Sequence, residues 1–176
     1  YLIHWPATSN QFYNWQKINS ETWKALEFLQ SQGKIRSIGV SNFLKHHLEP
    51  LLDNATVKPA VNQIEYLPGY MQDDCVKYCQ EQNIQIEGWS PLGRGKVFSN
   101  ETLNEIAVKY NKSVAQICIR WALQNNVLPL PKSVTPIRIK ENIDVFDFEL
   151  SDSAMILIDQ IDDIQSSGFH PDTVDF

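Results

Sequence analysis

The sequence has 176 residues, about the size of one domain, with 43% hydrophobic and 20% charged residues, as in a globular protein. A net charge of −6 argues against a general nucleic-acid-binding surface. No apolar run is long enough to cross a membrane, and no signal peptide is recognisable, so we expect a cytoplasmic protein. Three cysteines without disulfide or zinc spacing indicate a reducing compartment, and no metal site is expected.

Strands and helices alternate along the chain. The chain opens inside an apolar strand, where a domain seldom begins, so we expect it to be the C-terminal portion of a longer chain. In the helix expected at 45–53, His46 and His47 should be solvated, and Pro50 should lie near the helix start. The expected strands cover 1–6, 37–40, 59–66, 84–89 and the stretch from 127. The expected helices cover 20–32, 45–53, 72–82, 103–110 and the stretches from 113, 136 and 151, and Ser113 with Gln116 is expected to form a capping box.

Five strand–turn–helix units imply a parallel sheet covered by helices, with strands buried on both faces. Polar residues follow each strand, as they do at the active-site rim of a (β/α) barrel. An open doubly wound sheet would carry a glycine-rich turn after its first strand, and no G-x-G-x-x-G is present. Gly93-Arg94-Gly95 has no third glycine, and we interpret it as a loop. A barrel is therefore the better interpretation.

The stretch from Val127 to Asn142 indicates a phosphate site. Lys132 and Ser133 follow the strand, and Thr135-Pro136 is typical of a helix start. Helix N-termini favour phosphate, and Arg138 can bind one with two parallel hydrogen bonds. An ordinary strand–helix turn with solvated charges is equally compatible with this stretch taken alone.

With these motifs in place, the chain resembles the aldo-keto reductase family. The resemblance covers most of the chain and is carried, in the family's order, by Leu2-Ile3-His4-Trp5-Pro6, Lys34 to Phe43, Val61 to Tyr66, Trp89 to Gly93, and Leu130 to Ser133 with Arg138, Glu141 and Asn142. It implies a (β/α)8 TIM barrel in which this chain forms an incomplete barrel of about five strand–helix units. Residues 1–176 would be a single domain, with 163–176 as a C-terminal loop over the barrel mouth.

The resemblance also implies NADPH as the cofactor and the reduction of an aldehyde or ketone to an alcohol by hydride transfer. His4 would be the catalytic-tetrad histidine that orients the substrate carbonyl, and Trp5 would line the substrate pocket. The nicotinamide end would be bound by Ser41, Asn42 and Gln63 at the carboxamide and by Trp89, which stands where the family usually has a stacking Tyr. The rest of the cofactor would be bound by Ser90, Leu92 and Gly93 at the pyrophosphate, by Lys132, Ser133, Val134 and Arg138 at the 2′-phosphate, and by Glu141 and Asn142 near the adenine.

The family's other tetrad members, an Asp, a Tyr and a Lys, come from strands that precede the histidine strand. We therefore expect this chain alone to be inactive and to self-associate through open sheet edges, although a full-length parent would be a monomeric reductase of small carbonyl compounds. Two alternatives stay open: a non-catalytic NADPH-binding or regulatory member of the fold, and a phosphate-binding barrel isomerase or aldolase. None of these involves nucleic acid or a membrane.

Overall fold

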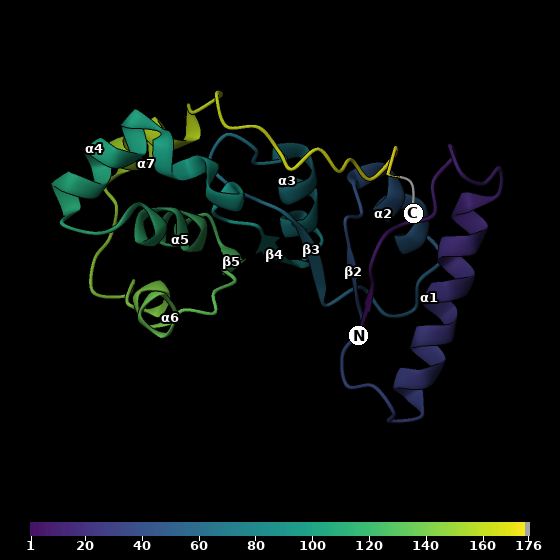
Figure 1. Cartoon of the computed structure of the whole chain (residues 1–176). Helices are drawn as coiled ribbons and strands as arrows, with labels where there is room; N and C mark the ends of the chain where they lie inside the picture. The colour runs from purple at the N-terminus through teal and green to yellow at the C-terminus, as the bar shows by residue number, and fades with distance from the viewer. Residues whose placement is uncertain (175–176) are drawn as a thin grey trace. The chain divides into compact units, whose positions relative to one another are not determined.

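A computed structural model of the chain describes residues 1–174 and has an α/β fold with one five-stranded sheet (Figure 1). The strands are β1 (Leu2–Ile3), β2 (Gly39–Ser41), β3 (Val61–Glu65), β4 (Gln85–Trp89) and β5 (Val127–Leu130), and they are neighbours in that order. β1 pairs with β2 and β2 with β3 in parallel, with Ile3 opposite Val40 and Ser41 opposite Gln63. The predicted α/β class with a parallel sheet is confirmed.

Helices connect successive strands. They are α1 (Trp15–Ser31), α2 (Lys45–Leu52), α3 (Asp73–Glu81), the 3-10 helix η1 (Gly93–Ser99), α4 (Glu101–Tyr110), α5 (Val114–Gln124), α6 (Pro136–Ile143) and α7 (Asp152–Asp159). The chain divides into two compact units. Unit 1 contains Tyr1–Ile64, Asp73–Ile86 and the described residues from Phe169 onward, and unit 2 contains Glu65–Gln72 and Glu87–Gly168.

Unit 1 has a core built from the apolar sides of α1 and α2. Trp23 and Leu26 of α1 are buried, as are Leu48 and Leu51 of α2. The Trp23 indole N–H donates to the Val57 carbonyl at 2.9 Å, which satisfies the polar atom of this buried ring. The cysteines of α3 are buried as free thiols.

Unit 2 is centred on α5. Its Trp121 is fully buried, stacks on Tyr66 at 4.8 Å between ring centroids, and donates its indole N–H to Asp159 at 2.8 Å. The predicted capping box is present: the Gln116 N–H donates to Ser113 Oγ, and the Ser113 N–H donates to Gln116 Oε1. This end of α5 is therefore fixed by local sequence.

Several predicted details were wrong. α1 begins at Trp15 rather than near residue 20, because Ser20 does not cap it. Pro50 lies near the end of α2 rather than its start, and His47 is buried rather than solvated. Gly93 opens η1 instead of a plain loop, with Arg94 and Gly95 in left-handed conformations that interrupt it.

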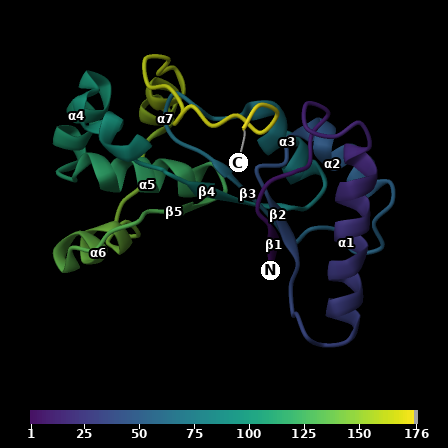
Figure 2. The same ribbon diagram turned by 45° about the vertical axis from the view of Figure 1, so that its right-hand side comes forward.

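The outer part of unit 2 exposes apolar side chains. Leu128 and Leu130 of β5 are 46% and 38% exposed, so the expectation that the strands are buried on both faces fails here. α6 has no buried residue, although its predicted start at Thr135-Pro136 is correct. Figures 1 and 2 both show α6 beside α5 and apart from α4 and α7. Among residues 1–174, no helix has both the length and the apolar character needed to cross a membrane.

Candidate functional site

In unit 1, three strand ends are tied together by the polar residues that follow them. The Asn42 N–H and the Ser41 hydroxyl both donate to the Gln63 carbonyl, at 2.9 Å and 2.7 Å. The Asn42 side-chain amide donates to the His4 carbonyl at 3.0 Å and to Ser41 Oγ at 3.2 Å. The structure thus brings together the four residues predicted at this edge.

Asn42 can make these bonds because of its backbone. Its φ is +62°, a left-handed conformation that Asn adopts more readily than most residues. Its side chain is buried together with that of Ser41. The amide therefore bridges the ends of β1 and β2 instead of pointing along the strand direction.

His4 and Trp5 lie at the same end of β1. The His4 side chain is exposed and Trp5 is half-buried, and their rings are 6.0 Å apart between centroids with a tilt of 53°. An exposed imidazole beside an indole face can donate a hydrogen bond to a small polar molecule that lies against the ring. The geometry is thus compatible with the predicted pair of a carbonyl-orienting histidine and a pocket-lining tryptophan.

In unit 2, a pocket of about 540 Å³ lies where the loop after β4, the start of α5 and the stretch after β5 meet. It contains six of the predicted cofactor residues. Its lining consists of Leu92, Arg94, Gly95 and Phe98 from the first segment, Ser113 and Ala115 from the second, and Lys132, Ser133, Arg138, Glu141 and Asn142 from the third. Residues that are 50 positions apart in sequence therefore share one cavity.

The pocket is positively charged within an acidic chain. Arg94, Lys132 and Arg138 line it with a single acidic residue, Glu141, so its lining carries a net charge of +2 while the chain carries −6. Basic groups that converge on one cavity attract an anion more strongly than the same groups scattered over a surface. The pocket is suited to a phosphate group or another anion.

Four of the predicted cofactor residues in unit 2 lie outside this lining. Val134 is 78% exposed, and Trp89 is half-buried at the end of β4. Ser90 has φ +51° and its carbonyl accepts the Gly93 N–H at 2.9 Å, so these two residues form the turn that leads into η1. Ser90 and Gly93 therefore shape the loop whose next residues line the pocket.

The loop into η1 is also tied to the segment 163–168. Lys96 Nζ donates to the carbonyls of Gln165 and Ser166 at 3.0 Å and 2.9 Å. The Glu65 carboxylate accepts the Ser167 backbone N–H at 3.0 Å and its hydroxyl at 3.0 Å. Burial raises the pKa of Glu65 above its ordinary value, although the bonds from Ser167 and the charges of Arg94 and Lys96 oppose this shift. This part of the C-terminal loop is thus fixed on unit 2, and 175–176 lie outside the described residues.

Sequence reasoning missed five pocket residues: Arg94, Gly95, Phe98, Ser113 and Ala115. Arg94 could have been found, because a basic residue between two glycines next to the predicted pyrophosphate loop is a candidate anion ligand. Ser113 was recognised only as a helix cap. Phe98 and Ala115 carry no pattern that separates a pocket wall from an ordinary helix surface.

Comparison with known proteins identifies the family. The family model described as "Aldo/keto reductase family" matches residues 1–163. The chain belongs to the aldo/keto reductase family. This membership agrees with the five strand–helix units, which correspond to part of the family's (β/α)8 barrel.

Individual aldo/keto reductases resemble the chain over its whole length. It is 49% identical over 176 residues to the glyoxal reductase of Bacillus subtilis, covering 100% of this chain and 61% of that protein. It is 42% identical over 174 residues to the methylglyoxal reductase DkgA of Escherichia coli, covering 98% of this chain and 61% of that protein. The chain thus spans about three fifths of the length of these curated relatives.

Two solved structures are also similar to this chain over its whole length. The apoform of Gox0644 has a TM-score of 0.90 and 44% identity, with 100% of this chain and 63% of that chain covered. A Gox0644 mutant in complex with NADPH has a TM-score of 0.89, 44% identity and the same coverage.

Proposed function

We propose that this chain supplies the NADPH-binding part and the catalytic histidine of a reductase that converts small aldehydes or ketones to alcohols. The observation that carries the proposal is the pocket with a net charge of +2 in a chain of net charge −6. NADPH differs from NADH by one phosphate, so a cavity lined by Lys132 and Arg138 favours the phosphorylated cofactor. The NADPH complex of the related Gox0644 supports this choice.

The donor set of the chain suits the cofactor. In unit 2, Arg138 and Lys132 would hold the 2′-phosphate with Ser133 and Val134, and Glu141 and Asn142 would lie near the adenine. Ser90, Leu92 and Gly93 would follow the pyrophosphate, and Trp89 would stack on the nicotinamide. In unit 1, Asn42 and Gln63 would bind the carboxamide with Ser41, whose hydroxyl is already used to hold the Gln63 carbonyl.

The bound cofactor would supply the hydride, and His4 would act on the substrate. Its exposed imidazole would donate a hydrogen bond to the carbonyl oxygen, whose negative charge grows during reduction. Trp5, half-buried beside His4, would limit the space available to the substrate. The names of the relatives in Bacillus subtilis and Escherichia coli make glyoxal and methylglyoxal the first substrates to test.

Turnover is proposed for a protein that contains more than these 176 residues. The family's Asp, Tyr and Lys have no counterpart in the motifs that match here, and without the acidic Tyr no group delivers a proton to the carbonyl oxygen. We therefore expect the chain alone to bind NADPH without reducing a carbonyl. A cytoplasmic location, and self-association through open sheet edges, stay predictions.

The binding test compares Arg138→Ala with Lys140→Ala. Both residues are exposed cations of α6, but only Arg138 lines the pocket. Arg138→Ala should weaken NADPH binding by about 10- to 100-fold, because a hydrogen bond to a charged group contributes about 1.5–3 kcal/mol. Binding of NADH, measured by the same calorimetric titration, should change little.

Lys140→Ala should bind both cofactors as the unmodified chain does. Equal weakening of NADPH and NADH by Arg138→Ala would contradict the 2′-phosphate assignment. Binding of neither nucleotide by the unmodified chain, in the presence of a native circular dichroism spectrum, would contradict the proposed function itself.

A further inference from the structure

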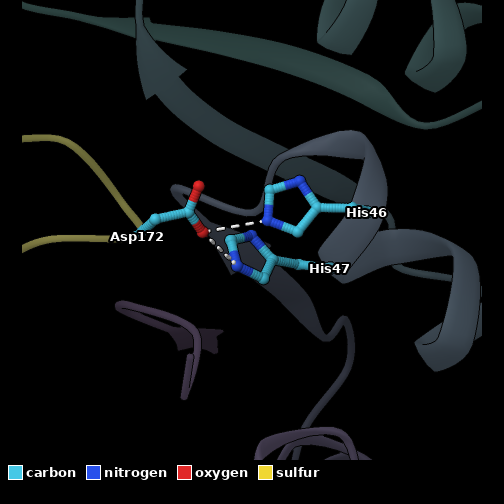
Figure 3. A group of neighbouring side chains, drawn as sticks. All are labelled: His46, His47 and Asp172. Atoms are coloured by element: carbon cyan, nitrogen blue, oxygen red, sulfur yellow. Dashed lines mark hydrogen bonds and ion pairs between the residues drawn. The ribbon is translucent and has the colours of Figure 1, made fainter. Parts of the chain in front are cut away.

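Asp172 lies between two histidines of α2 and fixes the C-terminal segment of unit 1. Its Oδ1 atom is 2.9 Å from His46 Nε2 and 3.0 Å from His47 Nε2. Figure 3 shows both imidazole rings, which come from adjacent residues of one helix, turned toward this carboxylate. Nothing in the proposed reaction uses these three side chains, so their arrangement needs another explanation.

The hydrogen bonds of His47 fix its protonation. Its Nδ1 atom accepts the Leu44 backbone N–H at 3.1 Å, so Nδ1 carries a lone pair and Nε2 carries the proton. Nε2 therefore donates to Asp172. The ring is 1% exposed and meets Trp15 edge-on at 5.5 Å between centroids, so it cannot turn without disrupting the packing. Both ring nitrogens have partners in this orientation only.

A metal ion is the obvious alternative, because the ligand atoms of His46, His47 and Asp172 lie within 4.8 Å of one another. A metal bound at His47 Nε2 would need the lone pair there and the proton on Nδ1, which would then face the Leu44 N–H. Metal-binding histidines instead donate their other N–H to an acceptor. The cluster therefore matches a carboxylate that accepts two N–H groups better than a metal site.

The segment that Asp172 fixes also holds the loop after His4 and Trp5. The Asp172 carbonyl accepts the Asn10 side-chain amide at 2.6 Å, and the Val174 carbonyl accepts that of Gln11 at 3.0 Å. Both amides belong to the loop 7–14, whose Tyr13 is 98% exposed. The start of this loop is fixed separately, since the Ala7 N–H donates to Asn19 Oδ1 at 2.8 Å. Its middle contains a turn in which the Gln11 and Phe12 N–H groups donate to the Thr8 carbonyl, and the C-terminal segment holds this turn from outside through the two side-chain amides.

We propose that Asp172 is a positioning residue for the substrate side of the site: it fixes the C-terminal segment on His46 and His47, and that segment holds the loop 7–14 beside His4 and Trp5. The inference rests on the proposed function and adds a determinant of substrate binding to it. Asp172 does not touch the substrate. It acts through the backbone carbonyls of its own segment, so its loss affects binding of the carbonyl compound more than the chemical step.

The test compares Asp172→Ala and Asp172→Asn with the control Asp162→Ala. Asp162 is an exposed carboxylate of the same C-terminal region, and its substitution by Ala removes the same charge as Asp172→Ala. In Asp172→Ala, amide hydrogen exchange in residues 7–14 should rise about tenfold or more, the equivalent of losing one to two net hydrogen bonds. Asp172→Asn keeps a neutral acceptor and should give a smaller rise. Asp162→Ala should leave exchange unchanged.

Kinetics in a full-length protein that carries this sequence separate positioning from general loosening. Asp172→Ala should raise the KM for methylglyoxal by about five- to tenfold while kcat and the NADPH affinity stay within about twofold. Asp172→Asn should recover part of the KM. A changed kcat with an unchanged KM would overturn the positioning role.

Three measurements keep the anchor testable even if the proposed function fails. Unchanged hydrogen exchange in residues 7–14 of Asp172→Ala would overturn the anchor, whether or not the full-length protein reduces carbonyls. A rise in melting temperature of the unmodified chain with Zn²⁺ that is absent in Asp172→Ala would overturn the hydrogen-bonded cluster in favour of a metal site. Nitrogen-15 spectra of histidine should show His47 protonated on Nε2, and a proton on Nδ1 would also contradict it.

Discussion

At the scale of single residues, His47 is a buried histidine whose pKa lies well below the ordinary value. The pKa of His47 is lowered from 6.5 to about 4, chiefly by burial and also by electrostatic repulsion from His46 and His170, whereas Asp172 opposes the shift. The Leu44 N–H also explains why the pKa is lowered, because a second proton on the ring would lie on Nδ1 and face this N–H group. His47 therefore stays neutral throughout the physiological range.

This shift predicts how stability depends on pH. Between pH 6.5 and about 4 the unfolded chain binds a proton at residue 47 that the folded chain does not. The free energy of unfolding should therefore fall as the pH decreases through this window, by on the order of 3 kcal/mol from this group. In His47→Gln, which keeps a side-chain N–H donor but cannot titrate, urea denaturation at a series of pH values should give a flatter profile. Identical slopes for the two proteins would contradict the assignment.

The sequence could not separate His46 from His47. Neighbouring residues on a helix point about 100° apart, so one faces the interior and the other faces solvent, but two equal residues do not reveal which. The buried one is decided by Trp15 and by the return of residues 169–174, more than 120 positions away. Contacts at that separation leave no trace in local periodicity.

At the scale of elements, β2 lies between β1 and β3, and its close packing against both requires a glycine at position 39. A Cβ atom on Gly39 would lie 2.7 Å from a methyl group of Leu2 and 2.8 Å from both the Val61 side chain and the Val61 carbonyl oxygen. The side chains could move, but the carbonyl belongs to the backbone of β3. The two strand neighbours can approach β2 at this point only because residue 39 is glycine.

We therefore expect Gly39→Ala to destabilise the chain by about 1–3 kcal/mol, the usual cost of adding a methyl group to a packed core. Gly33→Ala provides the comparison, because Gly33 has φ +68° and a Cβ there would meet nothing within 4 Å. The free energy of unfolding of Gly33→Ala should fall by only about 1 kcal/mol, the cost of holding an alanine in a left-handed backbone conformation. Chemical denaturation of both variants would measure the difference, and an equal or smaller loss for Gly39→Ala would contradict the close approach of the strands.

The predicted elements differ in how well local sequence specified them. The starts of α5 and α6 were correct, because Ser113 with Gln116 and Thr135 with Pro136 are complete start patterns. The start of α1 was wrong by five residues, since Asn14 precedes it without making a side-chain cap bond. The interrupted η1 was missed, because left-handed Arg94 results from the tertiary setting of the loop rather than from residue preference.

At the scale of the whole molecule, the order of the motifs was enough to predict five parallel strand–helix units and the family. It was not enough to predict the full pocket of unit 2. Ala115 comes from a helix whose pattern describes only its buried side, and Phe98 comes from η1, which was not predicted. The same limit applies to the apolar residues of β5 and α6: the pattern marks them as a buried surface, and in this chain they are exposed.

One further expectation concerns carbonyl reduction by a complete barrel. The chain covers 61% of the Bacillus subtilis glyoxal reductase, and its described residues form five strands, whereas a complete barrel has eight. We expect a chimera that adds the unmatched part of that reductase to this chain to reduce methylglyoxal with NADPH, because the family resemblance places the Asp, Tyr and Lys on strands that precede the histidine strand. The 176 residues alone should give no NADPH oxidation above background, measured by absorbance with the same substrate.

His4 provides the internal control of this experiment. If the chain contributes the histidine that orients the carbonyl, His4→Ala in the chimera should lower kcat by about 100-fold or more, the usual loss when a group that stabilises the developing oxyanion is removed. Binding of NADPH should persist, because Lys132 and Arg138 are unchanged. An active His4→Ala chimera would show that the added part is sufficient for catalysis, and turnover by the 176 residues alone would show that it is not needed.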